Sequence, residues 1–574
     1  MVTMDTRVIN KKSGMRNRNL TWLALVFVII VLVNFISSHL FFRLDLTSEK
    51  RYTLSAASRS LLKNLKDVLF IKIYLHGEFP PGFIRLEKAT RELLDEMRVY
   101  AGENIQYEFI DPSASDDVQQ RNELYRQLAR KGIVPTNLRE TGTGSTSEKI
   151  IFPGALIVSG SREQPVQLLK DHLGASPEAM LNNSILNLEY EFSNAFRKIT
   201  TPMPESIGFV QGHGELEQKY VADIMESLAG SYVVSPVTIN SRLKALNGFK
   251  TVIIAKPDSA FDEKDKFILD QFIMKGGRVL WLIDQVKAEM DSLASANEAL
   301  AVSNNLNLDD MLFRYGARIN YNLVQDLMAA PVPVVTGNIG NKPQQSLLPW
   351  YYFPVVIPAS VHPVVKNLNA VRFQFVSTID TVGAPSIRKT ALLTTSPYTR
   401  VLNAPVRITL ELMRSEPDIK SYNHKEQILA LLLEGNFQSL FTNRIPPEIE
   451  ESDEIGFSEN GKPSRMVVIS DGDVIRNDYR KSTAQAFPLG FDRYTGETYG
   501  NKNFLLNVID YLSDDSGLIS IRSKELKLRI FDKAKLASGK RMWQIICTAG
   551  PLLLVIAFGI IKYYLRRKKF LSPS

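Results

Sequence analysis

Two uncharged apolar segments, one near each end of the chain, constrain the fold more than any other sequence feature. Residues 20–42 and 542–561 contain no Asp, Glu, Lys or Arg. A transmembrane helix needs about 20 predominantly apolar residues, so both segments predict membrane-spanning helices. The first segment is too long for the apolar region of a signal peptide, and no A-x-A-like cleavage site follows it. We therefore expect an uncleaved anchor at 20–42 and a second anchor at 542–561.

Basic residues lie outside both apolar segments. Residues 1–19 carry five Lys or Arg against one Asp, residues 562–574 carry five and no acid, and the whole chain has a net charge of +8. The rest of the chain is therefore nearly neutral, which does not favour a nucleic-acid partner. The positive-inside rule predicts cytoplasmic tails at 1–19 and 562–574 and a large body on the far side of the membrane. The basic juxtamembrane segment 521–541 argues against this orientation.

The first half of the body, residues 43–200, has the pattern of a small α/β domain. Strands are expected at 68–75 and 105–110 with a helix between them at 85–100, followed by a helix at 118–131 and a hairpin. This order is that of a thioredoxin-like domain. The loop after the first strand has no CxxC motif, and Cys547, the single cysteine, lies in the second apolar segment. Thiol redox chemistry is therefore excluded there.

Residues 181–199 form an apolar seam with helical spacing. The face opposite this seam carries Glu189, Glu191, Asn194 and Arg197. We interpret the segment as a helix that packs the first domain onto the second, and a coiled-coil dimer is the alternative.

The second half of the body, residues 206–520, alternates strands and helices at short spacing. Such alternation predicts a Rossmann-like domain with a parallel, doubly wound sheet. The expected strands are 207–211, 232–237, 251–256, 278–283 and 465–470, and the expected helices are 219–229, 262–275 and 504–512. Residues from about 285 to 460 break this rhythm, and we interpret them as a large insertion.

Polar residues follow the expected parallel strands, where ligands of open α/β sheets bind. The ligand-binding candidates are Gly212, His213, Gly214, Glu215, Asp284, Asp471 and Asp473. His213, Glu215 and Asp473 have the chemistry of a general acid and base. A non-catalytic ligand site is the second interpretation. The third is structural: the glycines shape a tight turn and the aspartates cap helices. The third is favoured because neither a nucleophile nor a metal triad accompanies these residues.

Several catalytic motifs are absent from the sequence. It has no G-x-x-x-x-G-K-[ST] phosphate loop, no G-x-S-x-G nucleophile elbow and no H-E-x-x-H zinc motif. The six histidines are scattered, and no cysteine stands near them. We therefore expect no metal, no cofactor and no ATPase activity in this chain.

Several short segments occur in a characteristic order between the two apolar segments: RLDLTSEKRYTLS at 43–55, YEFIDP at 107–112, NNSILNLEYEFSNAFRKI at 182–199, GHGE at 212–215, DGD at 471–473 and GN at 500–501. In these residues and their order the chain resembles the GldG family of gliding-motility-associated ABC transporter auxiliary proteins of Bacteroidota.

The resemblance implies a two-span inner-membrane protein whose periplasmic body works with a separate permease and a separate ATPase. It also implies a Rossmann-like second domain shared with an intraflagellar-transport protein, with a saccharide or polymer as candidate ligand. The leading hypothesis is a non-enzymatic auxiliary subunit that relays the ATPase cycle through the juxtamembrane segments 43–55 and 522–541. The alternative is a membrane-tethered periplasmic hydrolase or saccharide-binding module that uses Gly212 to Glu215.

Overall fold

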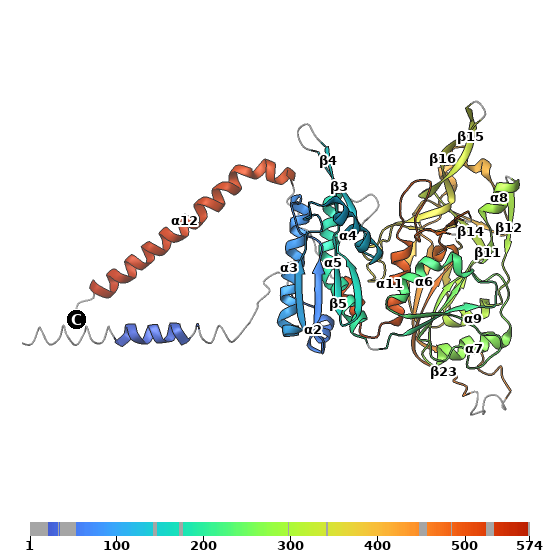
Figure 1. Cartoon of the computed structure of the whole chain (residues 1–574), viewed down its shortest axis with the longest axis horizontal. Coiled ribbons are helices and arrows are strands. Elements are labelled where there is room, and N and C mark those ends of the chain that lie inside the picture. Colours follow the sequence, from blue (N-terminus) through green and yellow to red (C-terminus); the bar gives the residue numbers. More distant parts are fainter. Residues whose placement is uncertain are drawn as a thin grey trace, which may run out of the picture. The chain divides into compact units, whose positions relative to one another are not determined.

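The structure is a computed structural model, shown in Figure 1. It describes residues 21–32, 34, 53–141, 146–170, 176–201, 203–296, 298–339, 342–446, 456–480, 482–483, 485–523 and 533–571. The chain divides into two compact units, residues 1–524 and residues 525–574. Each unit is described by itself.

The first part of the larger unit is built on a four-stranded sheet in the order β2-β1-β5-β6. Strand β1 pairs in parallel with β2 and antiparallel with β5, and β5 pairs antiparallel with β6. The element bounds are α2 Ala56–Lys63, β1 Leu69–Ile73, α3 Pro81–Ala101, β2 Ile105–Phe109, α4 Val118–Arg130, β3 Thr136–Thr141, β4 Thr146–Ile151, β5 Gly154–Ser159, β6 Arg162–Gln167 and α5 Pro177–Thr200. The strands and helices agree with the expected order; the thioredoxin-like assignment stays a prediction.

Local sequence explains where the helices of this part begin and end. Helix α3 has Pro81 in its first turn and ends at Gly102, whose φ of 63° is accessible to glycine without strain. Helix α4 begins after Asp117, whose carboxylate accepts hydrogen bonds from the backbone N–H groups of Gln119 and Gln120.

The second part of the larger unit contains a seven-stranded sheet in the order β19-β22-β23-β10-β9-β7-β8. The expected strands β8, β7, β9, β10 and β23 are parallel neighbours in this order. Strands β9 and β10 are buried along their whole length, as parallel strands covered on both faces are. The bounds are β7 Ser206–Gln211, α6 Ala222–Ala229, β8 Val233–Thr238, β9 Thr251–Ala255, α7 Glu263–Met274, β10 Arg278–Leu282, β23 Asn460–Ile469, α11 Asn501–Ser513 and η6 Leu518–Ser523.

The segment expected as an insertion contributes to this sheet, which corrects the prediction of a parallel sheet throughout. Strand β22 (Ile428–Gln438) pairs antiparallel with β23, and β19 (Arg388–Thr394) pairs antiparallel with β22. The other strands and helices of the segment are β11 Val286–Lys287, α8 Met290–Ala296, β12 Glu298–Ser303, α9 Asp309–Tyr315, β13 Ala317–Ile319, β14 Asn322–Asp326, β15 Ala329–Ile339, β16 Lys342–Val356, β17 Val371–Arg372, β18 Ile379–Thr381, β20 Thr399–Asn403 and β21 Val406–Thr409. Strands β15 and β16 pair as a long hairpin.

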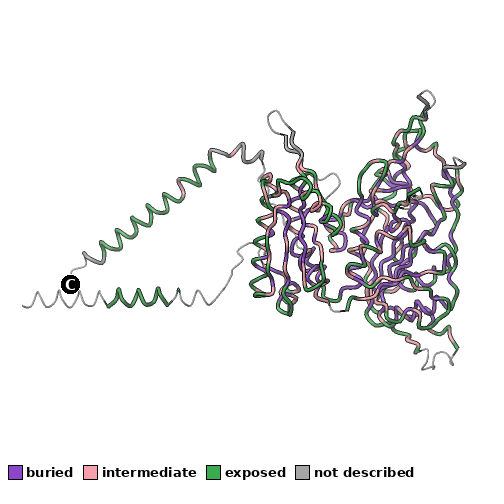
Figure 2. The backbone as a smooth tube through the Cα atoms, in the orientation of Figure 1, coloured by how far each residue is buried: buried purple, intermediate pink, exposed green. Residues whose placement is uncertain are grey.

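Helices cover both faces of the seven-stranded sheet. Ile224 of α6 and Phe504 of α11 belong to one apolar cluster with the sheet. Leu269 of α7 belongs to a second cluster, which contains Trp281 of β10. Figure 2 shows buried residues concentrated along the central strands of this part. The double covering agrees with the doubly wound architecture that the alternating pattern predicts.

Helix α5 contributes to two cores. Leu188 and Phe192 pack in the core of the four-stranded sheet, whereas Tyr190 packs in a core of the seven-stranded sheet. The packing helix predicted from the apolar seam is therefore observed. On the opposite face, Glu189 is only 8% exposed.

A buried charge cluster joins α5 to α11. The carboxylate of Asp510 accepts hydrogen bonds from the Tyr232 hydroxyl at 2.7 Å and from the Asn194 amide at 3.1 Å. The Lys198 ammonium lies 3.2 Å from the same carboxylate. Burial by itself raises the pKa of Asp510, but Lys198, Arg197 and these hydrogen bonds outweigh burial and lower it. Asp510 is therefore an ionised, fully partnered carboxylate between the two parts.

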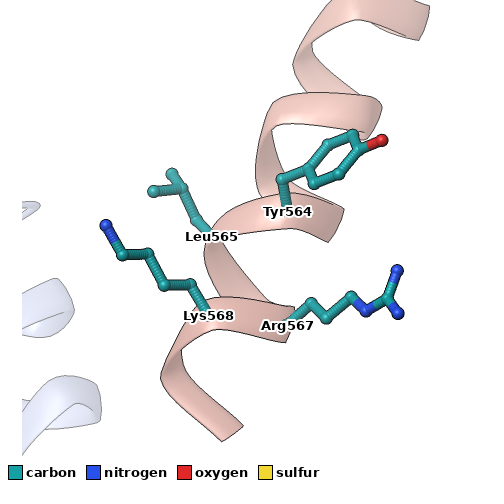
Figure 3. A pocket seen from close by; sticks show the side chains of 4 residues that line it. All are labelled: Tyr564, Leu565, Arg567 and Lys568. Carbon is teal, nitrogen blue, oxygen red and sulfur yellow. The ribbon is translucent and has the colours of Figure 1, made fainter. Parts of the chain in front are cut away.

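The smaller unit contains one long helix, α12, Lys533–Leu571. Its stretch Met542–Lys568 has a mean hydropathy of 2.2, and this helix is long and apolar enough to cross a membrane. Figure 3 shows Tyr564, Leu565, Arg567 and Lys568 around a surface pocket near the end of α12. Aromatic residues followed by basic ones are typical of the place where a span leaves the bilayer.

The first predicted anchor has less support. Its described part is a shorter apolar helix, Thr21–Leu32, so among the described residues α12 alone has the length of a span. Residues 20, 33 and 35–42 lie outside the described residues, as do both predicted tails apart from the end of α12. Residues 43–52 and 524–532, which belong to the two juxtamembrane segments, also lie outside the described residues. The membrane span at 20–42 stays a prediction.

Candidate functional site

The predicted site residues lie at the carboxyl edge of the seven-stranded sheet. Gly212 follows β7, Asp284 follows β10, and Asp471 follows β23. Because these strands are parallel and β9, β10 and β23 are adjacent, the residues after them are brought to one edge. The structure divides the predicted residues into two side-chain clusters at this edge.

The first cluster is centred on a lysine that follows β9. The Lys256 ammonium lies 2.6 Å from Asp473 Oδ2 and 3.2 Å from Asp284 Oδ2. The Lys256 side chain is 13% exposed, and the side chains of Asp284 and Asp473 are 10% and 6% exposed. Arg476 pairs with the other oxygen of Asp473 at 3.3 Å. The lysine therefore lies between two of the ligand-binding candidates, Asp284 and Asp473.

Backbone N–H groups use the remaining oxygens of this cluster. Asp471 accepts hydrogen bonds from the N–H groups of Asp473 at 2.7 Å and Gln374 at 2.6 Å. Asp284 Oδ1 accepts one from Gly472 at 2.5 Å. These contacts connect the loop after β23 to the neighbouring strand end, so Asp284 and Asp471 hold loop backbone here instead of forming the expected helix caps.

The carboxylates of Asp284, Asp471 and Asp473 share this small volume. The pKa values of two of them, Asp284 and Asp471, are raised. Burial and the charge of Asp473 raise the pKa of Asp284 to about 6, although Lys256 acts to lower it. Burial and the charges of Asp284 and Asp473 also raise the pKa of Asp471. Burial acts to lower the pKa of Lys256, but the charges of Asp284 and Asp473 outweigh it and raise the pKa. The lysine is therefore cationic at neutral pH.

Gly472 is required by the close approach of this loop to Lys256. A Cβ atom at position 472 would lie 2.5 Å from the Lys256 Cβ and 2.9 Å from its Cα. Lys256 itself has a positive φ of 54°, which is uncommon for a residue with a side chain. The two backbones therefore pack in direct contact at the strand ends.

The second cluster surrounds His213. Its ring stacks on Phe261, with the centroids 3.7 Å apart and the planes 12° from parallel. His213 Nδ1 lies 3.2 Å from Glu215 Oε1, and Nε2 lies 3.0 Å from Asp265 Oδ2. All three charged groups are less than 9% exposed. Although burial acts to lower the pKa of His213, the two carboxylates outweigh burial and raise it. The two carboxylates therefore favour the charged form of this buried ring, the imidazolium.

Two partners in these clusters were not among the sequence candidates. Lys256 is the last residue of the expected strand 251–256, and Asp265 lies in the first turn of α7, where an acidic residue needs no functional reason. Conversely, Asp473 does not join His213 and Glu215, since it pairs with Lys256 and Arg476. The predicted acid and base set is therefore split between the two clusters.

The described residues contain no group of three or more His, Cys, Asp or Glu side chains arranged to hold a metal ion. The carboxylates of the first cluster are bridged by lysine, and those of the second by histidine. The geometry therefore builds two internal ion-pair networks at the sheet edge.

A family described as "ABC-type uncharacterized transport system" matches residues 204–508, more than half of the 574 residues. The chain belongs to this family. Every candidate site residue lies within the matched region. A second match, to a domain of unknown function, covers residues 48–158, which include the strands β1 to β4 and all but the last residue of β5.

Two further proteins are similar to this chain. An uncharacterized protein of Borreliella burgdorferi is 19% identical over 573 residues, which cover 97% of this chain and 99% of the relative. This similarity therefore extends over nearly the whole chain. A solved structure of the mmIFT52 N-terminal domain is 14% identical, covers 54% of this chain and 99% of the solved chain, and has a TM-score of 0.30. This score is too low to establish a common fold.

The buried imidazolium gives a testable pH dependence in this family member. The folded-state pKa of His213 is raised, so its contribution to stability is complete below about pH 6.5 and is lost as the pH rises through the folded pKa. The loss is about 1.4 kcal/mol for each pH unit between the two pKa values. Chemical denaturation from pH 6 to 9 should show this slope in the native chain and not in His213→Gln.

His76→Gln provides the matched control for this experiment. His76 also pairs with a carboxylate, Glu87, but its side chain is 52% exposed. We expect the native pH slope in this variant. The same slope in His213→Gln as in the native chain would contradict the buried-imidazolium assignment.

Proposed function

We propose that this protein is a membrane-anchored, non-enzymatic auxiliary subunit of an ABC-type transport system. The observation that carries the proposal is the family match over residues 204–508. The proposed body binds a partner and couples it to separate permease and ATPase subunits. Gliding motility, to which the sequence resemblance points, is the proposed physiological context.

The division of labour follows from the sequence. The chain has no phosphate-binding loop of the P-loop type, so a partner has to hydrolyse the ATP. Helix α12 supplies an anchor, and the apolar segment at 20–42 is proposed as the second. With basic tails at both ends in the cytoplasm, the positive-inside rule puts the body in the periplasm.

The geometry of the sheet edge argues against catalysis there, in keeping with a non-enzymatic coupling role. His213 and Glu215, the proposed acid and base of a hydrolase, are buried, and each is bound to an internal partner. A substrate would have to displace the ion pairs of Lys256 to enter between Asp284 and Asp473. These observations favour the structural interpretation of the edge.

Affinity purification from native membranes tests the proposal. The full chain carries a tag, the membranes are solubilised in mild detergent, and co-purifying proteins are identified by mass spectrometry. We expect a permease and an ATPase in stoichiometric amounts. An unrelated inner-membrane protein with the same tag serves as the control. Recovery of the chain alone, in a detergent in which other membrane complexes survive, would contradict the proposal.

A further inference from the structure

Both ends of the body that continue toward the apolar segments dock on the same helix, α5. Helix α2 begins after Ser55 and follows the predicted first anchor in the chain, and η6 ends at Ser523, before α12. Helix α5, at 177–200, is far from both of these ends along the chain. Its turn from Glu189 to Ser193 nevertheless contacts both of them, and Figure 1 shows α2 beside α5.

The α2 side of this junction is a buried hydrogen-bond network. Glu189 Oε1 accepts hydrogen bonds from the Ser55 N–H at 2.6 Å and from the Ser58 hydroxyl at 2.8 Å. The Ser58 hydroxyl also lies 3.0 Å from that of Ser193. Ser58 and Ser193 are fully buried. Ser55 is also the N-cap of α2, because its side chain accepts a hydrogen bond from the Ser58 N–H. The carboxylate of Glu189 therefore holds the start of α2 on α5.

The η6 side of the junction uses the next residue of α5. The Arg522 guanidinium lies over the Tyr190 ring, 5.3 Å from its centroid, and donates a hydrogen bond to the Lys366 carbonyl at 2.9 Å. Tyr190 is 3% exposed and Arg522 is 7% exposed. A cation over a buried aromatic ring is attracted by the electron-rich face of the ring, so Arg522 holds η6 on α5.

The two sides share one apolar cluster. Leu518, Ile519 and Ile521 of η6 pack in the same core as Tyr190, and Ala57 and Leu61 of α2 pack against that core. Side chains in a close-packed core adjust together, because a gap left by one element removes contacts from its neighbours. Loss of α2 from α5 should therefore loosen η6.

The junction also contains buried polar atoms without hydrogen-bond partners. They are Arg59 Nε on α2, Asn187 Oδ1 on α5 and Arg522 Nε on η6. Opening the junction would let water reach these atoms and offset part of the lost packing. The free energy needed to open the junction is therefore lower than it would be if every buried polar atom had a partner.

We propose that α2, α5 and η6 form a clamp that couples the two membrane-directed ends of the body. Releasing either end from α5 lowers the stability of the other. The proposal deepens the proposed transporter function and rests on it for its physiological meaning: a movement imposed at one anchor reaches the other through α5. The thermodynamic coupling itself is a property of the isolated chain.

Hydrogen exchange measured by mass spectrometry on the full chain in detergent tests the clamp. In Glu189→Ala, we expect amides of residues 518–523 to exchange about tenfold faster or more. Loss of a buried hydrogen bond to a charged group changes an equilibrium by about tenfold or more, and the clamp passes this loss from α2 to η6. Glu191→Ala is the matched control. Glu191 lies on the same helix and pairs with Lys170 at 3.1 Å. This control should leave the exchange of 518–523 unchanged.

Coupling has to be reciprocal, which supplies a second test. Arg522→Gln should increase exchange in residues 55–63. If Glu189→Ala does not fold, Ser58→Ala removes a single hydroxyl and should give the same pattern at smaller amplitude. Faster exchange at 55–63 with unchanged exchange at 518–523 would overturn the clamp. Because no partner protein is needed, failure here is distinguishable from failure to recover transporter subunits, which would count against the proposed function.

Discussion

Lys256→Met is expected to lower the free energy of unfolding of the seven-stranded-sheet part by about 3–5 kcal/mol, as loss of one partner of a buried ion pair does. The ammonium group of Lys256 contacts both Asp284 and Asp473. Arg476 stays paired with Asp473 in the variant, so the uncompensated charge falls on Asp284. Methionine keeps most of the volume, so the loss is electrostatic and not a cavity effect.

Denaturant unfolding followed by tryptophan fluorescence measures this loss, because Trp281 and Trp350 are fully buried in this part. The matched control is Lys287→Met. Lys287 also bridges to an aspartate, Asp258, but the two side chains are 46% and 65% exposed. Exposed pairs contribute about 1 kcal/mol or less, so the control should be close to the native chain. Equal effects of the two substitutions would contradict the central role of Lys256.

The same cluster has a signed pH dependence. The folded-state pKa of Asp284 is raised to about 6 from 3.8, so its contribution to stability is present below pH 3.8 and is lost as the pH rises through 6. Removing Lys256 removes the largest effect that lowers this pKa. Lys256→Met should therefore lose more stability above pH 6 than below it, and Lys256→Met combined with Asp284→Asn should recover part of the loss.

Asp510→Ala is the second substitution with a large expected effect, also about 3–5 kcal/mol. It leaves the Tyr232 hydroxyl, the Asn194 amide and the Lys198 ammonium without their shared acceptor at the α5–α11 junction. Asp380→Ala is the matched control. Asp380 pairs with Arg318 at 2.8 Å, but both side chains are about half exposed, so a change below about 1 kcal/mol is expected.

The sign of the pH effect at Asp510 is opposite to that at Asp284. The folded-state pKa of Asp510 is lowered, so its contribution is present above the unfolded value of 3.8 and is lost as the pH falls through the folded pKa. Denaturation of the native chain and of Asp510→Ala should therefore converge in acid. A difference between them that persists unchanged at pH 2 would contradict the assignment of an ionised, partnered carboxylate.

The sequence by itself determined the features that depend on local pattern. The apolar runs of β7, β9, β10 and β23 and the helices between them follow from periodicity, which the chain carries residue by residue. The position of Asp284, Asp471 and Asp473 at one edge also followed, because parallel neighbouring strands end on the same side. The helical spacing of the apolar residues in α5 likewise predicted that this helix packs against other elements.

Only the tertiary structure decided which residues become partners. Lys256 fills the space between the carboxylates, and Asp265 reaches His213 from α7, because the packing of separate elements sets these contacts. Strands β19 and β22 join the main sheet, although they lie in the segment that the sequence indicates as an insertion. The residue pattern within a strand does not determine which strand pairs with it. Glu189 lies on the polar face of α5 in sequence, yet it is buried because α2 covers it with two hydrogen-bond donors. A charged residue can be buried where its partners are supplied from distant positions, and the local sequence does not contain that information.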